Sequence, residues 1–288
     1  MKRLFAALLL CCLFSAAPAW AKKGTLLVAF GTSVGSARPA IEAVVADYKE
    51  KKDGPVLLAF TSDIIRNKLA AAGKPVHSVN AALDALAAQG VDEVLVQSLH
   101  VAPAEEYSQL ERMIVRHVTK KPGVFTSVKV GYPLLVSEQD LDTVVSVVLG
   151  ALPERRKDDA VVLMGHGNDR GPGDLTLAAA ATAFHKADAL VWLATVEGAH
   201  SFDRVLPQLR AAGVKRVWLQ PFMLVAGDHA RNDLAGSEDD SWASRIRAAG
   251  MTPVPHLVGL GQLAGIRQVF LEHSRDAVID LAKPGKAE

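Results

Sequence analysis

The chain has 288 residues, of which 50% are hydrophobic and 22% are charged, and its formal net charge is +1. This composition excludes intrinsically disordered, collagen-like and low-complexity proteins. The balanced charge provides no basic field of the kind that indicates nucleic-acid binding. The length suits one large domain or two of ordinary size.

The N-terminal segment, residues 1–21, has the layout of a secretory signal peptide. A short positive start precedes an apolar run over residues 4–14, and residues 19–21 form a small-x-small cleavage sequence. An uncleaved anchor is the alternative, but the run is short for a membrane span, which needs about 20 residues. We therefore expect cleavage after Ala21 and export to the periplasm. The chain's two cysteines, Cys11 and Cys12, belong to this segment, so any metal site in the remainder must use His, Asp or Glu.

The first half of the remaining chain alternates short apolar runs with amphipathic stretches. Apolar runs predict strands over residues 25–30, 56–61, 93–99 and 125–131, and helical spacing predicts helices over 39–51, 78–89, 105–119 and 137–149. This alternation is typical of a parallel sheet covered by helices on both faces.

The second half repeats the pattern after a charged break at residues 153–159, which we interpret as a solvated linker. Strands are predicted over 160–164, 190–196, 216–222 and 253–257, and helices over 175–186, 201–212, 241–249 and 263–281. Residues 29–32 align with 163–166, and 88–97 align with 211–220, as after a domain duplication. The sequence therefore predicts two similar flavodoxin-like, doubly wound α/β domains, 22–152 and 160–288, facing a central cleft.

Three metal-binding residue types follow successive strands of the second half. His166 comes after the first strand, Glu197 after the second and His229 after the third, one βα unit apart. In a parallel sheet of flavodoxin-like order all three reach one edge, with His166 in the centre, and neighbouring strands are about 4.8 Å apart. Two histidines and one carboxylate make an open site for a divalent metal. The alternative is that each is an ordinary loop residue.

Other residues have weaker signals. In the first half, Glu106 opens a helix, where a carboxylate also stabilises the helix N-terminus, and His100 follows the third strand at the expected cleft edge. His117 lies near a helix end, where an imidazolium favours the helix dipole. It is also a candidate haem ligand, because haem commonly takes an axial His. Residues 31–33 follow a strand as a weak anion-binding sequence.

At these residues the sequence resembles the class II tetrapyrrole chelatases, most closely the anaerobic sirohydrochlorin cobaltochelatases. The resemblance covers about residues 24–280, and its most specific stretch is Leu-Val-Ala-Gly-Asp-His over residues 224–229. The segments that carry it are 30–33, 59–62, 96–100, 106–107, 164–167, 223–230, 240–242 and 259–261. It implies a tetrapyrrole bound between the two domains. It also implies that His166 and His229 are metal-binding and catalytic, that Glu197 completes the metal site, and that Glu106 is an active-site glutamate.

The expected reaction inserts Co²⁺ into metal-free sirohydrochlorin and releases two protons. Contacts with the carboxylate-rich substrate are expected from Thr32, Ser33 and His100, with Arg38 and Arg231 as further anion partners. His and carboxylate ligands also accept Fe²⁺, Ni²⁺ and Zn²⁺, so the ligand types leave the metal open. An exported metal-binding or haem-binding carrier on the same fold is the alternative function, and a homo-oligomer is left open.

Overall fold

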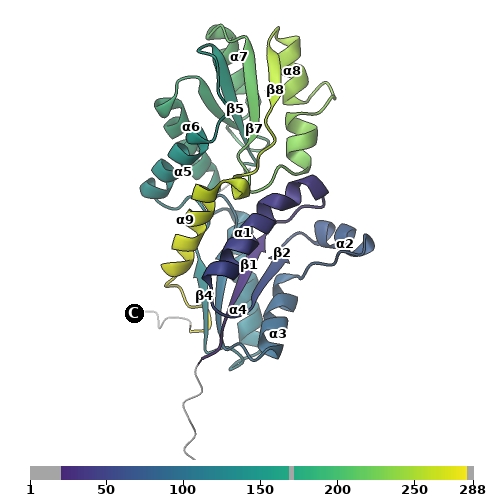
Figure 1. The fold of residues 1–288 in the computed structure, drawn as a ribbon, viewed down its shortest axis with the longest axis vertical. Coiled ribbons are helices and arrows are strands. Elements are labelled where there is room, and N and C mark those ends of the chain that lie inside the picture. The colour runs from purple at the N-terminus through teal and green to yellow at the C-terminus, as the bar shows by residue number, and fades with distance from the viewer. Residues whose placement is uncertain (1–20, 169–171, 284–288) are drawn as a thin grey trace, which may run out of the picture.

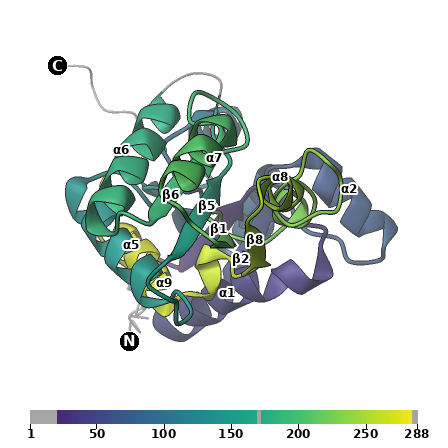
Figure 2. The same ribbon diagram turned by 90° about the horizontal axis from the view of Figure 1, so that it is seen from above.

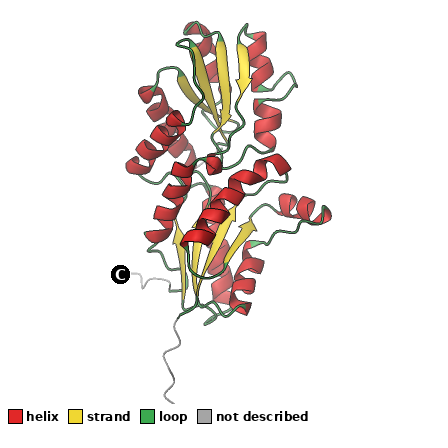
Figure 3. Cartoon of the chain, viewed as in Figure 1, coloured by secondary structure: helices red, strands yellow, loops and turns green. Residues whose placement is uncertain are grey.

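The computed structural model describes residues 21–168 and 172–283, so residues 1–20 of the expected signal peptide lie outside the described range. The described chain contains two four-stranded sheets, visible as two groups of arrows in Figure 3. Their strands are β1 Lys23–Ala29, β2 Val56–Phe60, β3 Glu93–Ser98, β4 Ser127–Gly131, β5 Asp159–Gly165, β6 Val191–Thr195, β7 Arg216–Pro221 and β8 Thr252–Pro255.

Helices connect these strands and cover the sheets (Figure 1). They are α1 Arg38–Lys51, α2 Asp63–Ala71, α3 Val79–Ala88, α4 Glu105–Lys120, α5 Glu138–Gly150, α6 Pro172–Ala187, α7 Phe202–Ala211, α8 Trp242–Ala248 and α9 Ala264–Arg275. Three short turns complete the set, η1 Gly35–Ala37, η2 Ala230–Leu234 and η3 Leu260–Gln262, of which η2 is a π-helix. Across the described ranges, none of the helices has the length and apolar character needed to cross a bilayer.

Both sheets are parallel and have the same strand order. The first runs β2-β1-β3-β4 and the second runs β6-β5-β7-β8. In each sheet the first strand is central, flanked by the second and third, which is the flavodoxin-like order. The shared topology confirms the predicted α/β fold with two similar sheets.

The carboxyl ends of the two sheets face each other. Figure 3 shows the arrowheads of both sheets pointing toward the middle of the molecule. Loops after the strands of both halves therefore meet in one place, and ligands bind to open α/β sheets at this edge.

The last helix crosses from the second half of the chain to the first sheet. Helix α9 packs on β3 and β4, and the chain beyond it bonds to the β4 edge, where Val130 donates its N–H to Ile279 and Leu281 donates to Val128. The expected helix over 263–281 thus ends at Arg275, because residues 279–281 pair with a strand instead.

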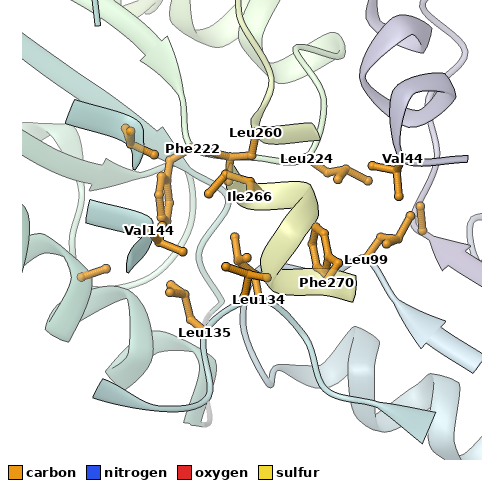
Figure 4. Close-up of a cluster of buried hydrophobic side chains, with 14 of the residues drawn as sticks. Val44, Leu99, Leu134, Leu135, Val144, Phe222, Leu224, Leu260, Ile266 and Phe270 are labelled. Atoms are coloured by element: carbon orange, nitrogen blue, oxygen red, sulfur yellow. The ribbon is translucent and has the colours of Figure 1, made fainter. Parts of the chain in front are cut away.

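Helix α5 crosses in the opposite direction and packs on α6, so the expected boundary at 152–160 separates the sheets but not all of the helices. In Figure 2, seen from above, α5 and α6 lie on one side of the molecule and α2 and α8 on the other. Buried side chains from both halves form one apolar cluster where the chain crosses (Figure 4). Its members include Val44, Leu99, Leu134, Leu135, Val144, Phe222, Leu224, Leu260, Ile266 and Phe270.

Two local features differ from the sequence expectation. Helix α2 was not predicted, although Ser62 accepts a hydrogen bond from the Ile65 N–H at its N-terminus. The charged break at 153–159 is only partly solvated, because Asp159 is 1% exposed and already belongs to β5. Arg216 pairs with it, and this hydrogen bond holds the pKa of the Asp159 carboxyl well below its usual range.

Candidate functional site

A cavity of about 320 Å³ lies between the facing edges of the two sheets. Residues following β1, β3, β5 and β7 line it, so both halves of the chain contribute walls. From the first half come Phe30, Thr32, Leu99, His100 and Glu106, and from the second His166, Gly167, Phe222, Asp228 and His229, among others. The lining contains no lysine or arginine among the described residues. The cleft is mostly apolar with a few polar groups, which is the usual composition of a small-molecule site.

His166 and His229 meet in this cavity. Their ring centroids are 5.1 Å apart and the rings meet edge to face, with an interplanar angle of 82°. His166 follows β5 directly, whereas His229 lies eight residues beyond the end of β7, next to η2. The strand order thus brings together two of the three residues expected to converge, although they are far apart in the sequence.

The Nδ1 atom of His166 forms a hydrogen bond with the main chain. It lies 2.9 Å from the carbonyl oxygen of Gly167, and because a carbonyl only accepts, Nδ1 must carry the proton. Gly167 has φ +82°, and a Cβ there would stand 2.0 Å from the carbonyl oxygen of Glu197. Only glycine therefore lets this turn close against the neighbouring strand end and hold the His166 ring in place.

The Nδ1 atom of His229 is held by a carboxylate. It lies 2.5 Å from Oδ2 of Asp233, one turn further along the same segment. Both side chains are about half exposed, at 42% and 44%. A carboxylate on one ring nitrogen orients the imidazole and leaves the other nitrogen as the ligand atom, as in the outer shell of many metal sites.

Both imidazoles consequently have Nε2 as their free nitrogen. Two nitrogens bound to one ion at about 2.0–2.1 Å each are at most about 4 Å apart. Ring centroids at 5.1 Å are compatible with such an arrangement. The pair can therefore present two neutral nitrogen ligands to a single divalent ion.

Glu197, expected as the third ligand, does not join them in this structure. Its side chain is exposed and is not part of the cavity lining. Its main chain is close, since its N–H donates to the His166 carbonyl at 2.9 Å. Residues 21–168 and 172–283 accordingly contain no group of three His, Cys, Asp or Glu side chains placed to hold a metal ion.

His100 forms part of the opposite wall. Its Nδ1 lies 2.9 Å from the Ser98 hydroxyl, while Nε2 is buried without a hydrogen-bond partner among the described residues. Burial lowers the pKa of His100 to about 4, so the imidazole is neutral at pH 7. Because buried polar atoms nearly always have a hydrogen-bond partner, we expect a bound ligand to form a hydrogen bond with this Nε2.

The other expected contacts from the first half divide into two groups. Glu106, in the first turn of α4, and Thr32 both line the cavity. Ser33 does not line it, because the chain turns after Thr32, whose hydroxyl accepts the Val34 N–H.

The two expected anion-binding arginines also lie outside the cavity lining. Arg38 is 3.4 Å from Glu42, and Arg231 donates to the Ser36 hydroxyl at 2.5 Å. The second of these bonds joins η2 of one half to η1 of the other, so Arg231 spans the two halves.

His117, the candidate haem ligand, lies outside the cavity lining. Its side chain is 6% exposed, and its Nε2 is 3.3 Å from a carboxylate oxygen of Asp84. The ring is buried between α3 and α4 and is not part of the cavity lining, so a haem ligand at this residue stays a prediction. Burial lowers the pKa of His117, which opposes the charged imidazolium expected near the end of α4.

Sequence reasoning missed two carboxylates near the histidines. Asp228 lines the cavity, and Asp233 bonds His229. The signal for Asp233 was present in the sequence, because a His and an Asp four residues apart meet on one face of a helical turn.

Comparisons with known proteins identify relatives of this chain. The sequence profile of a family described as cobalt chelatase (CbiK) matches residues 23–279. A sirohydrochlorin cobaltochelatase (CbiKC) of Nitratidesulfovibrio vulgaris is 38% identical over 259 residues, covering 89% of this chain and 91% of that protein. The sirohydrochlorin cobaltochelatase of Salmonella typhimurium is 37% identical over 263 residues, covering 89% of this chain and 97% of that protein.

Solved structures show the same fold at much lower identity. SirB from Bacillus subtilis with Fe³⁺ superposes with a TM-score of 0.63 at 16% identity, covering 88% of this chain and 95% of that one. The sirohydrochlorin chelatase SirB of Bacillus subtilis subspecies spizizenii, in complex with cobalt, has a TM-score of 0.59 at 14% identity and covers 88% and 94%.

Proposed function

Because the chain belongs to the cobalt chelatase (CbiK) family, we propose that it inserts Co²⁺ into sirohydrochlorin. In this reaction the ion replaces two pyrrole N–H protons, so one Co²⁺ is consumed and two protons are released. The observation that carries the proposal is the pair of imidazoles in the interdomain cleft, each with its Nδ1 bonded and its Nε2 free. The assignment makes the chain a lyase acting on a metal-free tetrapyrrole.

In the proposed mechanism His166 and His229 bind the incoming Co²⁺ through Nε2. Glu197 then completes the ligand set: its main chain is anchored to His166, so only an exposed side chain has to rotate. Two neutral nitrogens and one carboxylate leave positions open for water and for the pyrrole nitrogens. The ion passes from these ligands to the macrocycle.

The first half of the chain supplies the opposite wall. Glu106 lines the cavity at the start of α4 and is proposed to accept a pyrrole proton, together with the imidazoles once they release the metal. His100, neutral and with Nε2 unpartnered among the described residues, is proposed to hydrogen-bond the substrate and set its position. The Thr32 hydroxyl is a further proposed contact on the same wall.

The ligand types do not restrict the metal to cobalt. Imidazole and carboxylate accept Fe²⁺, Ni²⁺ and Zn²⁺ as well, and we propose Co²⁺ as the physiological ion on the strength of the family. Insertion of Fe²⁺ by the same residues is the first alternative to compare in the assay.

The expected signal peptide favours a second candidate function. An exported two-domain protein with a ligand cleft could carry a metal or a tetrapyrrole in the periplasm without turnover. We propose export with cleavage after Ala21, supported by the layout of residues 1–21 and by a family match that begins at residue 23. N-terminal sequencing of the protein from a periplasmic fraction tests this. Recovery of uncleaved chain from the cytoplasm alone would contradict it.

Activity is tested by mixing the protein with sirohydrochlorin and Co²⁺ without oxygen and following the absorption change of the macrocycle. We expect multiple turnovers for the wild type and a severe loss of rate for His166→Ala and for His229→Ala. His185→Ala is the matched control, because His185 is a histidine of α6 outside the cavity lining. Stoichiometric binding without turnover would favour the carrier, and wild-type rates in both cleft variants would refute the assignment of the site.

A further inference from the structure

A second cavity, also of about 320 Å³, lies at the other end of the first sheet. It is lined by the first residues of β1, β3 and β4 and by the last residues of α1 and α9. The chelatase cleft is at the carboxyl ends of the same strands. A seven-residue strand such as β1 is about 20 Å long at 3.3 Å per residue, so the two cavities are separate sites.

Five cationic residues and two acidic residues line this second cavity. The cations are Lys23, Lys51, Lys52, Lys129 and Arg275, and the acids are Asp53 and Glu93. Over the described ranges, none of the four lysines has a carboxylate within 4.0 Å, and Arg275 has only Glu272 at 4.0 Å. The cavity therefore has an excess of positive charge in a chain whose formal net charge is only +1.

Helix ends do not account for this cluster. Lysine and arginine in a last turn stabilise the negative end of a helix, which explains Lys51 in α1 and Arg275 in α9. Lys23 and Lys129, however, come from β1 and β4, where there is no helix end to stabilise. Cations from four separate elements thus face one space.

Lys52 shows that the positive charges are close enough to oppose one another. Its pKa is lowered from the usual lysine value, first by burial and then by the charge of Arg275. Like charges held together at a partly buried position cost free energy unless an anion lies between them.

The walls of the cavity are fixed by the fold. The turn after α1 closes on β1 at Gly54, which has φ +83° and leaves no room for a Cβ beside the Lys23 carbonyl oxygen, 2.0 Å away. On the other side, the hydroxyl of Tyr48 in α1 bonds Ser274 of α9 at 2.6 Å and donates to the Phe270 carbonyl at 2.7 Å. These hydrogen bonds hold α1 and α9 together near the ends that carry Lys51, Lys52 and Arg275.

From these observations we propose that the second cavity binds a small multivalent oxyanion, with two or more negative charges on phosphate or carboxylate groups. Its volume is at the lower limit for small-molecule sites, about 300 Å³, which suits a small ligand. Four of the five cations are lysines, which act as mobile point charges and accept phosphate and carboxylate alike. Binding here is independent of the chelatase cleft.

Calorimetric titration of the full chain with pyrophosphate and with citrate tests the proposal, since these probes carry phosphate and carboxylate charges respectively. Acetate is the monovalent control. We expect saturable binding of at least one multivalent probe with a dissociation constant below about 1 mM and little binding of acetate. The stronger of the two probes identifies the chemical class of the ligand.

The variant Lys52→Gln/Lys129→Gln removes one cation from a helix end and one from a strand. Because a hydrogen bond to a charged group is worth about tenfold or more in affinity, we expect this variant to bind the stronger probe at least about tenfold more weakly. Lys49→Gln/Lys74→Gln is the matched control, because both lysines are exposed and neither lines the cavity. Equal affinity in the two double variants, or no saturable binding by the wild type, would overturn the proposal. Chelatase rates should be the same in all three proteins.

Discussion

Asp233, the carboxylate that bonds His229, provides the sharpest test of how the histidine pair binds a metal ion. Asp233→Ala removes the oxygen that lies 2.5 Å from Nδ1 of His229 and leaves the imidazole free to rotate and to change tautomer. His229 then spends less time with Nε2 unprotonated and directed into the cleft. The loss should therefore be seen in the affinity for Co²⁺, before any tetrapyrrole is added.

The size of the effect follows from the exposure of the pair. Losing an outer-shell partner typically reduces metal affinity or activity by about 10- to 100-fold. Here both side chains are about half exposed, at 42% and 44%, and solvent screening weakens exposed charge pairs. We therefore expect about tenfold weaker Co²⁺ binding, or about 1.4 kcal/mol. Asp233→Asn should lose less, because its amide oxygen can still accept a hydrogen bond from the Nδ1–H of His229.

Calorimetric titration with Co²⁺ and anaerobic chelation kinetics provide the assay. The control is Asp239→Ala, which removes an exposed carboxylate from the loop after η2. Equal Co²⁺ affinity in Asp233→Ala and Asp239→Ala would refute the reasoning that Asp233 holds Nδ1 of His229 and thereby leaves Nε2 to bind the metal.

Three further predictions concern the walls of the cleft and the packing that holds it. Because the folded-state pKa of His100, about 4, lies below its usual value of 6.5, this residue adds stability above pH 6.5 that is lost as the pH falls toward 4. Replacing His100 with Asn should thus flatten the acid dependence of urea unfolding and raise the KM for sirohydrochlorin. Gly167→Ala should cost about 2 kcal/mol or more and weaken Co²⁺ binding, since its Cβ would meet the Glu197 carbonyl. Gly90→Ala, with φ +75° but open space around it, should show only the backbone cost in thermal unfolding. Tyr48→Phe should lower the free energy of unfolding by about 1–3 kcal/mol while the chelation rate stays unchanged, and an altered rate would mean that α9 communicates with the cleft.

The sheets and the histidine pair could be predicted because both depend on rules that act along the chain. Buried parallel strands are continuous apolar runs, and their carboxyl ends share an edge whatever lies between them. His166 directly follows a strand, so its place was set once the strand was recognised. His229 is eight residues past its strand, and its position depended additionally on the loop returning to the same edge.

The rest depended on interactions between distant parts of the chain. The sequence of residues 264–275 does not predict that α9 packs on β3 of the first sheet rather than on the second sheet, because an apolar helix face can pack on either one. Glu197 follows its strand as closely as His166 does, yet the turn that bonds its N–H to His166 leaves the carboxylate exposed. Strand-end position therefore predicts where a main chain will lie, but not which way its side chain will point.

The exchanged helices also bear on how the cleft can work. Since α5 packs beside α6 and α9 packs on β3 and β4, the two halves are joined by an apolar cluster as well as by the connecting chain. Opening the cleft widely would separate buried side chains such as Phe222, Leu260 and Ile266 (Figure 4), at about 1.5–3 kcal/mol for each one fully exposed. A hinge with a large swing is therefore costly, and the distance from His166 and His229 to the opposite wall is largely set before any ligand arrives. In such a preorganised cleft the macrocycle has to fit between fixed imidazoles and the wall of His100 and Glu106, so binding energy can be used to orient its nitrogens toward the metal.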